Sequence, residues 1–385
     1  MALELVEVTS RRQLRTFIKF GYSHYRGNAY AVPDLYVDMV NTFTPGGNAA
    51  LEFCDLVLYM VLRDGKVAGR VAGIINRRAN GVWNRKTVRF GWIEFEDDIR
   101  ISSMLVSAVA EWGASKGMTE MEGPFGFTDF DPEGMLVDGF DMLGTMSTIY
   151  NYPYYPVHME SLGFERSAEW VEWSIPFDVI PEKMNRLSDV VLKRCNLHIP
   201  EFGRKSAEAV KYARKLFELV NVAYAPLYGY SAFSDKQIDD MVRRYLPLID
   251  KRLVTFLLDS SGELVAAGMV LPSLAKALRK SGGRLFPLGW WHIFRVLKIH
   301  PDETVDLMFL AVRPDYQNKG LNSVMFSRMI PVARSMGMKV AESNPELVSN
   351  SRMQAHWQYF EGARIHKRRC AYRMDLDNWN GKVGL

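Results

Sequence analysis

The sequence lacks the features that mark secreted, metal-binding and membrane-spanning chains. Its three cysteines, Cys54, Cys195 and Cys370, are far apart and form no CxxC pair, which argues against a disulfide scaffold. The segment MALELVEVTSRRQL has no apolar core of a signal peptide. No run approaches the roughly 18 apolar residues of a membrane span. We therefore expect no transmembrane segment and a cytoplasmic location.

A large excess of charge of one sign is missing as well. The formal net charge is +4 over 385 residues, which gives no reason to expect a nucleic-acid partner. His292 and His300 have no clustered partners, so we expect no metal site. The chain is 48% hydrophobic and 24% charged, a globular composition, and it is long enough for two domains.

The first half of the chain predicts the element order β-α-β-β-β-α-β-α-β. Periodicity and turn residues place strands at 3–8, 56–63, 67–76, 88–94, 119–122 and 169–175, and helices at 11–25, 101–115 and 155–162. Ser10 is the expected cap of the first helix.

The second half shows a similar order. Strands are expected at 253–258, 264–271, 305–312, 339–342 and 370–376, and helices at 207–223, 235–246, 323–336 and 352–360. We predict an α/β (α+β) fold of two tandem domains, 1–178 and 183–385, each with a mixed, mostly antiparallel sheet flanked by helices. An internal duplication fits this order.

The segment TVDLMFLAVRPDYQNKGLNSVMFSRMIPVARS carries the functional argument. An apolar strand, a polar loop with Gly320 and an immediate helix make an anion site, because free backbone N–H groups at a helix start and the helix dipole favour negative charge. Gly320 lets the backbone approach a pyrophosphate, and Lys319 adds positive charge.

This loop resembles the Q/R-x-x-G-x-G/A segment of the GNAT superfamily of N-acetyltransferases. Asn322 stands where that family usually has Gly or Ala. The resemblance implies that acetyl-CoA or another acyl-CoA binds here, with its pantetheine arm along the preceding strand, which splays from its neighbour. The implied binding residues are Leu310, Ala311, Val312, Gln317, Asn318, Lys319, Gly320, Leu321, Asn322, Ser323 and Asn350.

Two residues are candidates for proton transfer. Asp306 shares a strand face with Leu310 and Val312, and relatives place a carboxylate base in this region; its alternative role is to cap the strand start. ESNPELVSNSRMQAHWQYFEGARIHKRR resembles the last strand–helix unit of the family, which implies Tyr359 as the proton donor to the thiolate. The other role for Tyr359 is packing.

The strand-to-helix junction GWIEFEDDIRISSML of the first half carries four carboxylates and no glycine at its turn, so we expect this half not to bind CoA. The loop GPFGFTDFDPEG either contacts a substrate or is an ordered surface loop. With LVDGFD (136–141), its Gly123-Pro124-Phe125 resembles an uncharacterised bacterial group of paired GNAT-like domains.

Two further features leave alternatives open. Glu342 and Glu346 could hold a cationic amine, or be solvated, which we favour. The insertion at about 272–303 is basic and aromatic. It could form a lid beside the CoA tunnel or an interfacial helix on anionic lipid, but a helical pair packed on the sheet is the commoner arrangement.

We therefore expect an acyl-CoA-dependent N-acyltransferase that transfers the acyl group directly to a small-molecule or peptide amine in a ternary complex. No Ser/His/Asp or Cys/His arrangement is visible for a covalent intermediate. One alternative is an aminoacyl-tRNA-dependent transferase of the same tandem fold. Another is a non-catalytic binding or regulatory protein.

Overall fold

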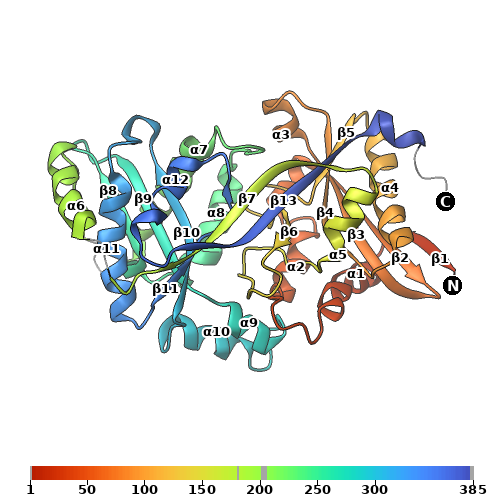
Figure 1. Ribbon diagram of the computed structural model, residues 1–385, viewed down its shortest axis with the longest axis horizontal. Coiled ribbons are helices and arrows are strands. Elements are labelled where there is room, and N and C mark those ends of the chain that lie inside the picture. The colour runs from red at the N-terminus through yellow and green to blue at the C-terminus, as the bar shows by residue number, and fades with distance from the viewer. Residues whose placement is uncertain (1, 180–181, 201–205, 382–385) are drawn as a thin grey trace. The chain divides into compact units, whose positions relative to one another are not determined.

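Local sequence signals set the ends of several helices. The computed structural model describes residues 2–179, 182–200 and 206–381 (Figure 1). Helix α1 (Arg11–His24) begins at a capping box, because the Ser10 hydroxyl accepts from the Gln13 N–H while the Gln13 side chain accepts from the Ser10 N–H. Helix α8 (Asp235–Tyr245) begins in the same way, with Ser234 and Gln237. Both predicted helices are confirmed.

The chain folds into two units that exchange segments of sequence. The first unit contains residues 1–171, 278–290 and 366–385, and the second contains residues 172–277 and 291–365. Strands β7 (Glu165–Pro176) and β13 (Arg364–Asp375) each pass from one unit into the other. The linear division at 178–183 stays a prediction of where one repeat ends and the next begins, because the units are defined by packing.

In the first unit the strand order is β1-β2-β3-β4-β5-β13, and β6 also pairs with β13. These strands are antiparallel neighbours except for β4 and β5, which are parallel. The elements are β1 (Leu3–Glu7), α2 (Tyr36–Thr42), β2 (Cys54–Arg63), β3 (Lys66–Asn76), α3 (Arg77–Val82), β4 (Thr87–Phe95), α4 (Ile99–Ser115), β5 (Glu120–Gly123), β6 (Met135–Asp138) and α5 (Tyr154–Ser161).

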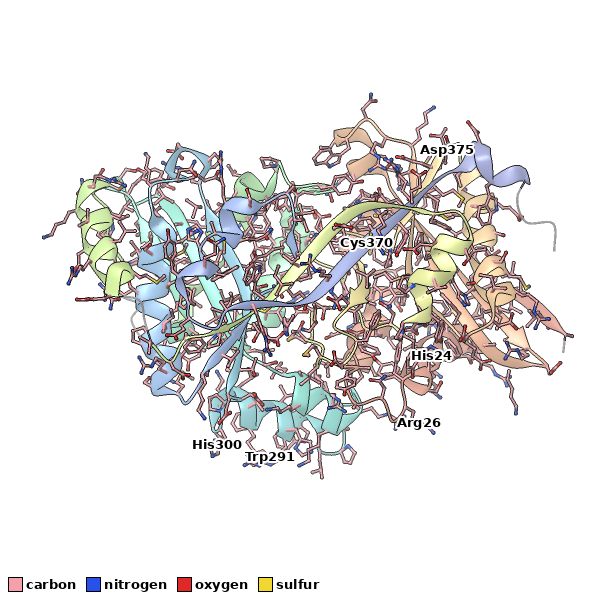
Figure 2. The ribbon with its side chains drawn as sticks, in the orientation of Figure 1. His24, Arg26, Trp291, His300, Cys370 and Asp375 are labelled. Carbon is pink, nitrogen blue, oxygen red and sulfur yellow. The ribbon has the colours of Figure 1, made fainter. Side chains whose placement is uncertain are left out.

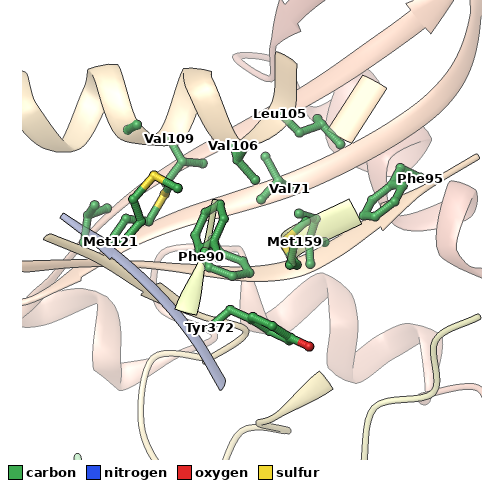
Figure 3. Close-up of a cluster of buried hydrophobic side chains, with 14 of the residues drawn as sticks. Val71, Phe90, Phe95, Leu105, Val106, Val109, Met121, Met159 and Tyr372 are labelled. Atoms are coloured by element: carbon green, nitrogen blue, oxygen red, sulfur yellow. The ribbon is translucent and has the colours of Figure 1, made fainter. Parts of the chain in front are cut away.

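Helix α4 supplies one wall of the core of this unit (Figure 3). Its Leu105, Val106 and Val109 are fully buried against side chains of the sheet such as Phe90 and Met121. Tyr372, from the last strand of the chain, is buried in the same cluster. The core therefore depends on residues that are more than 250 positions apart in the sequence.

In the second unit the strand order is β7-β11-β10-β9-β8. Only β10 and β11 are parallel. The remaining elements are α6 (Glu182–Arg194), α7 (Ser206–Tyr224), β8 (Val254–Leu258), β9 (Leu264–Pro272), β10 (Thr304–Val312), α11 (Leu321–Ser335), β11 (Val340–Glu342), β12 (Glu346–Leu347) and α12 (Ser351–Gln354). The boundaries between the units fall within α9 (Ala275–Ser281) and α10 (Gly289–Lys298). The mixed α/β fold class is confirmed. Among the described residues, no helix is both long and apolar enough to cross a bilayer.

The two units share one detail of strand pairing. In each, the parallel ladder has three residue pairs and then stops, at Arg89 and Glu122 in the first unit and at Asp306 and Glu342 in the second. The pairing of β4 and β10 with their antiparallel neighbours then shifts register, as at a β-bulge. Beyond these points β4 and β10 each have an edge that the parallel neighbour does not cover.

Candidate functional site

The free edge of β10 begins where its pairing with β11 ends. The Arg313 N–H donates to the Val265 carbonyl of β9, so strand alternation turns the backbone groups of Leu310 and Val312 toward the opposite edge. Three side chains donate to carbonyls on that edge: Asn344 to Met308 at 3.3 Å, Tyr224 to Leu310 at 3.3 Å and Gln317 to Val312 at 3.2 Å. An extended ligand with amide groups can pair with such an edge.

Helix α11 starts directly beyond this edge with an open N-terminus. Its N-cap residue is Gly320, whose φ of 87° is left-handed, and the described structure records no side-chain hydrogen bond that caps this end. The first N–H groups of a helix need an acceptor from outside the helix, and its dipole favours an anion. A Cβ at Gly320 would lie 3.1 Å from Val191 Cγ2 of helix α6, so a side chain here would be strained and crowded.

Positive side chains lie beside this helix start. Arg194 of α6 donates to the Lys319 carbonyl at 2.8 Å. The Lys319 ammonium and the Arg313 guanidinium lie 4.6 and 4.8 Å from the centre of the Tyr316 ring. Arg313 also forms an ion pair with Asp315 at 2.7 Å. Arg194 lies more than 120 positions before the loop, so no local sequence signal could have predicted its place here.

Asn322, the departure from the family pattern, is held by a histidine. The His356 Nδ1 lies 2.9 Å from the Arg352 carbonyl, and its Nε2 lies 3.1 Å from the Asn322 side-chain amide. The carbonyl requires a proton on Nδ1, so Nε2 accepts from Asn322 in the neutral ring. This hydrogen bond links the Asn322 side chain to His356, which lies in the segment after α12.

Glu346 is a carboxylate of this unit whose acidity is strongly altered. The Trp357 indole N–H lies 2.9 and 3.1 Å from its two oxygens, and burial raises the pKa of Glu346 to about 7. A carboxylate with this pKa can accept a proton near neutral pH. The sequence analysis favoured a solvated Glu346, whereas the structure shows a half-buried side chain that accepts from the Trp357 indole N–H.

Tyr224 of α7 provides a neutral hydroxyl on the β10 edge. Burial raises its pKa to about 12, and the negative charge of Glu346 contributes to the shift. The hydroxyl therefore keeps its proton near neutral pH. The sequence analysis placed residues 207–223 on a helix and missed Tyr224, because nothing local shows that this helix faces β10.

The structure places the other predicted residues as follows. Asp306 is buried at the last β10–β11 pair, and Asn350 is the N-cap of α12, with no capping bond from its side chain. Tyr359 is 56% exposed, which is a poor setting for proton transfer inside a site. Ala311, Leu321 and Ser323 are buried, Ser323 lies in the first turn of α11, and Asn318 has a left-handed φ of 62°.

The matching edge in the first unit is filled by the chain itself. The Phe125 N–H donates to the Phe90 carbonyl of β4 at 2.9 Å, and a Cβ at Gly91 would lie 2.3 Å from the Phe125 carbonyl oxygen. Helix α4 is capped by the Asp98 carboxylate, which also pairs with Arg63 and Arg100. The loop 123–134 is thus packed into the sheet and is not a surface loop.

A Ser–His–Asp arrangement does occur in the first unit, although the sequence showed none. Ser102 Oγ lies 2.9 Å from His158 Nδ1, and His158 Nε2 lies 3.0 Å from Asp97. Ser102 has no solvent-exposed surface, and its hydroxyl also lies 3.0 Å from the Ile99 carbonyl. A buried hydroxyl within a helix cannot reach a substrate, so the arrangement is structural.

The first unit also contains a cavity of about 570 Å³. Aromatic side chains and arginines line it, together with Asp34, whose pKa burial raises to about 6. Pro124 and Pro132 of the loop 123–134 form part of its wall. The size and the mixture of flat apolar walls with a few charged groups suit a small organic molecule. Lining residues include Tyr22, Tyr25, Arg26, Trp92, Tyr150 and Arg284.

Comparison with solved structures assigns the fold to a class. The chain matches a tandem GNAT protein from the clavulanic acid biosynthesis pathway with a TM-score of 0.54 and 14% identity, over 97% of this chain and 99% of that one. A GCN5-related N-acetyltransferase from Sphaerobacter thermophilus matches with a TM-score of 0.51 and 12% identity, over 97% and 96%. The chain thus has the tandem GNAT fold.

Two curated proteins are similar in sequence over most of the chain. Protein YghO of Escherichia coli is 24% identical over 328 residues, which cover 84% of this chain and 80% of YghO. The bacterial ceramide synthase of Caulobacter vibrioides is 21% identical over 350 residues, which cover 90% and 89%. No protein-family model matches the chain.

Proposed function

We propose that the chain is an acyl-CoA-dependent N-acyltransferase whose donor site lies in the second unit. The observation that carries this proposal is the continuous path from the free edge of β10 to the uncapped start of α11. Pantetheine contains two amides that can pair with a strand edge, and the CoA pyrophosphate is an anion suited to a helix N-terminus. The predicted binding residues from Leu310 to Ser323 lie along this path.

The chemistry follows from the groups beside the path. Glu346 removes a proton from the acceptor amine, and the amine nitrogen attacks the thioester carbonyl. The C–S bond then breaks, the sulfur takes the electron pair, and Tyr224 protonates the thiolate. The amide and free CoA are the products. In this proposal Glu346 and Tyr224 take the roles that the sequence analysis gave to Asp306 and Tyr359.

The relatives support an amine as the acceptor. A ceramide is the N-acyl amide of a long-chain amino alcohol, so the name of the Caulobacter relative describes a product of amine acylation. The first unit would not serve as a second donor site, because its β4 edge is occupied and its helix α4 is capped by Asp98.

Calorimetry with acetyl-CoA and a longer acyl-CoA tests the donor site. We expect micromolar binding to the wild type and at least about tenfold weaker binding to Lys319→Glu, since the change places a negative charge beside the pyrophosphate. Gly320→Asp should abolish binding, but its strained backbone makes Lys319→Glu the cleaner variant. Lys116→Glu, at the exposed C-cap residue of α4, is the matched control.

A wild type that binds neither acyl-CoA would contradict the proposal. Equal affinities of the wild type and Lys319→Glu would move the donor site away from this loop.

A further inference from the structure

A group of large apolar side chains is exposed on one continuous stretch of chain, residues 286–299. Phe286 is 79% exposed and Trp291 is 41% exposed, and four neighbours are also exposed. Helix α10 contains most of this stretch, and Figure 2 labels Trp291 on it and His300 just beyond its end. The six residues are Phe286, Leu288, Trp290, Trp291, Phe294 and Ile299, and we call them the aromatic patch.

The patch is distinct from the face on which α10 packs. Gly289, Ile293 and Leu297 are buried at i, i+4 and i+8, which defines the inward face of the helix. Trp290, Trp291 and Phe294 lie outside that face. A helix that only packs on a sheet needs apolar residues on one face, and α10 has a second, exposed apolar group.

Local contacts hold the patch in place. The Trp291 and Phe294 rings stack with centroids 5.9 Å apart. The Trp290 indole N–H donates to the Pro287 carbonyl at 3.1 Å, and the Trp290 backbone N–H donates to Leu285 at 2.8 Å. A Cβ at Gly289 would lie 1.7 Å from the Arg284 carbonyl oxygen. The loop before α10 is thus folded tightly against the start of the helix.

The charge around the patch has one sign. Residues 273–301 contain six Lys or Arg and no Asp or Glu. Lys276 is paired with Asp302 at 3.0 Å, whereas Arg284, Arg295 and Lys298 form no ion pair within the described part of the chain. Aromatic side chains beside Lys and Arg suit the interface of a bilayer, where rings enter the headgroup region and cations meet lipid phosphates.

We propose that the aromatic patch and its flanking cations dock the protein on the surface of an anionic lipid bilayer. Helix α10 has ten residues and is about 15 Å long, so it lies on the surface and does not span it. The proposal is independent of acyl transfer, because it rests on the exposed residues of this stretch alone.

Sedimentation of the full chain with vesicles tests the proposal. We expect binding to vesicles of phosphatidylcholine with about 30% phosphatidylglycerol, and at least about tenfold weaker binding to phosphatidylcholine alone. Raising the ionic strength from about 0.1 to about 0.5 M should weaken binding further. Binding should be at least about tenfold weaker in the triple variant Phe286→Ser, Trp291→Ser, Phe294→Ser. The double variant Arg295→Gln, Lys298→Gln should weaken binding to the same degree.

Two controls separate docking from folding and from association. Val82→Ser and Lys116→Gln change exposed residues elsewhere and should bind as the wild type does, and all variants should keep the wild-type circular dichroism. Equal sedimentation with neutral and anionic vesicles, or wild-type binding by the triple variant, would overturn the proposal. The proposal would also be overturned if the wild type bound no vesicles and instead formed a dimer that the triple variant abolishes.

Discussion

Individual side chains of the second unit show how the fold sets acidity. Glu346 is the clearest case, because burial raises its pKa to about 7 although the hydrogen bond from the Trp357 indole lowers it. Tyr224, on the β10 edge, is shifted in the direction that keeps its proton. Near neutral pH, Glu346 is therefore partly ionised while Tyr224 keeps its proton.

The first prediction concerns the pH dependence of turnover. The wild-type rate should rise with pH through about 7 as Glu346 loses its proton, and Glu346→Gln should lower kcat roughly 100-fold or more and remove this rise. The measurement is kcat/KM against pH with an amine whose own pKa is well separated. A retained rise near pH 7 in Glu346→Gln would assign it to another group.

The same residue predicts a pH-dependent stability difference. The pKa of Glu346 is raised in the folded protein above its ordinary value of 4.5, so the folded state binds this proton more tightly. Its contribution to stability falls as pH rises from about 4.5 to about 7 and is constant above. The unfolding temperature of Glu346→Gln should therefore rise relative to that of the wild type between pH 5 and pH 8. If the difference in unfolding temperature between the variant and the wild type stayed the same from pH 5 to pH 8, that result would contradict the raised pKa.

A second pair of residues separates two candidate proton donors. Tyr224→Phe should lower kcat by about tenfold or more, because the leaving thiolate loses its proton source. An acyl donor with a more acidic leaving thiol should restore much of the rate. Tyr359→Phe should have little effect, since Tyr359 is largely exposed. A large effect of Tyr359→Phe alone would return that residue to the site.

At the scale of elements, the two units use the same strand pairing with different results. The parallel ladder stops after three pairs in both, yet beyond it the edge of β10 accepts from side chains, whereas that of β4 is covered by the backbone of the loop 123–134. From the four carboxylates and the missing glycine, the sequence analysis predicted only that the first half does not bind CoA. It could not predict that the chain itself fills the β4 edge, because that contact joins residues about 35 positions apart.

Two glycines test this packing as a matched pair. Gly91→Ala should destabilise the protein by about 2 to 4 kcal/mol, because its Cβ would meet the Phe125 backbone. Gly81→Ala, in helix α3 with nothing within 4 Å, should be neutral or stabilise by up to about 1 kcal/mol. Urea unfolding monitored by circular dichroism measures both. Equal stability of the two variants would show that the loop yields at little cost.

At the scale of the whole molecule, sequence periodicity predicted most strands and helices but not their grouping. The predicted helix 207–223 corresponds to α7 (Ser206–Tyr224), and the strand 305–312 corresponds to β10. The predicted helix 352–360 is shorter, because α12 ends at Gln354. The path of β13 into the first unit left no local signal, since a strand pattern does not name its partners.

The exchange of segments predicts how fragments behave. Residues 1–178 alone lack Cys370, Tyr372 and Met374, which are buried in the core of the first unit, so this fragment should not unfold cooperatively. Joining residues 366–381 to it through a flexible linker should restore part of the transition. Thermal circular dichroism measures the unfolding of both fragments. A cooperative transition in 1–178 alone would support the linear division at 178–183 as a folding boundary.

The place of β13 in the chain also sets an order of events during synthesis. Residues 1–171 leave the ribosome long before Tyr372 and Trp379 are added, and these two side chains belong to the core of the first unit. The sheet of the earlier half therefore stays incomplete, with β5 unpaired on the side that β13 later occupies, until β13 has been made. Nascent chains of this protein should depend on chaperones that shield strand edges more than a protein of two consecutive domains does.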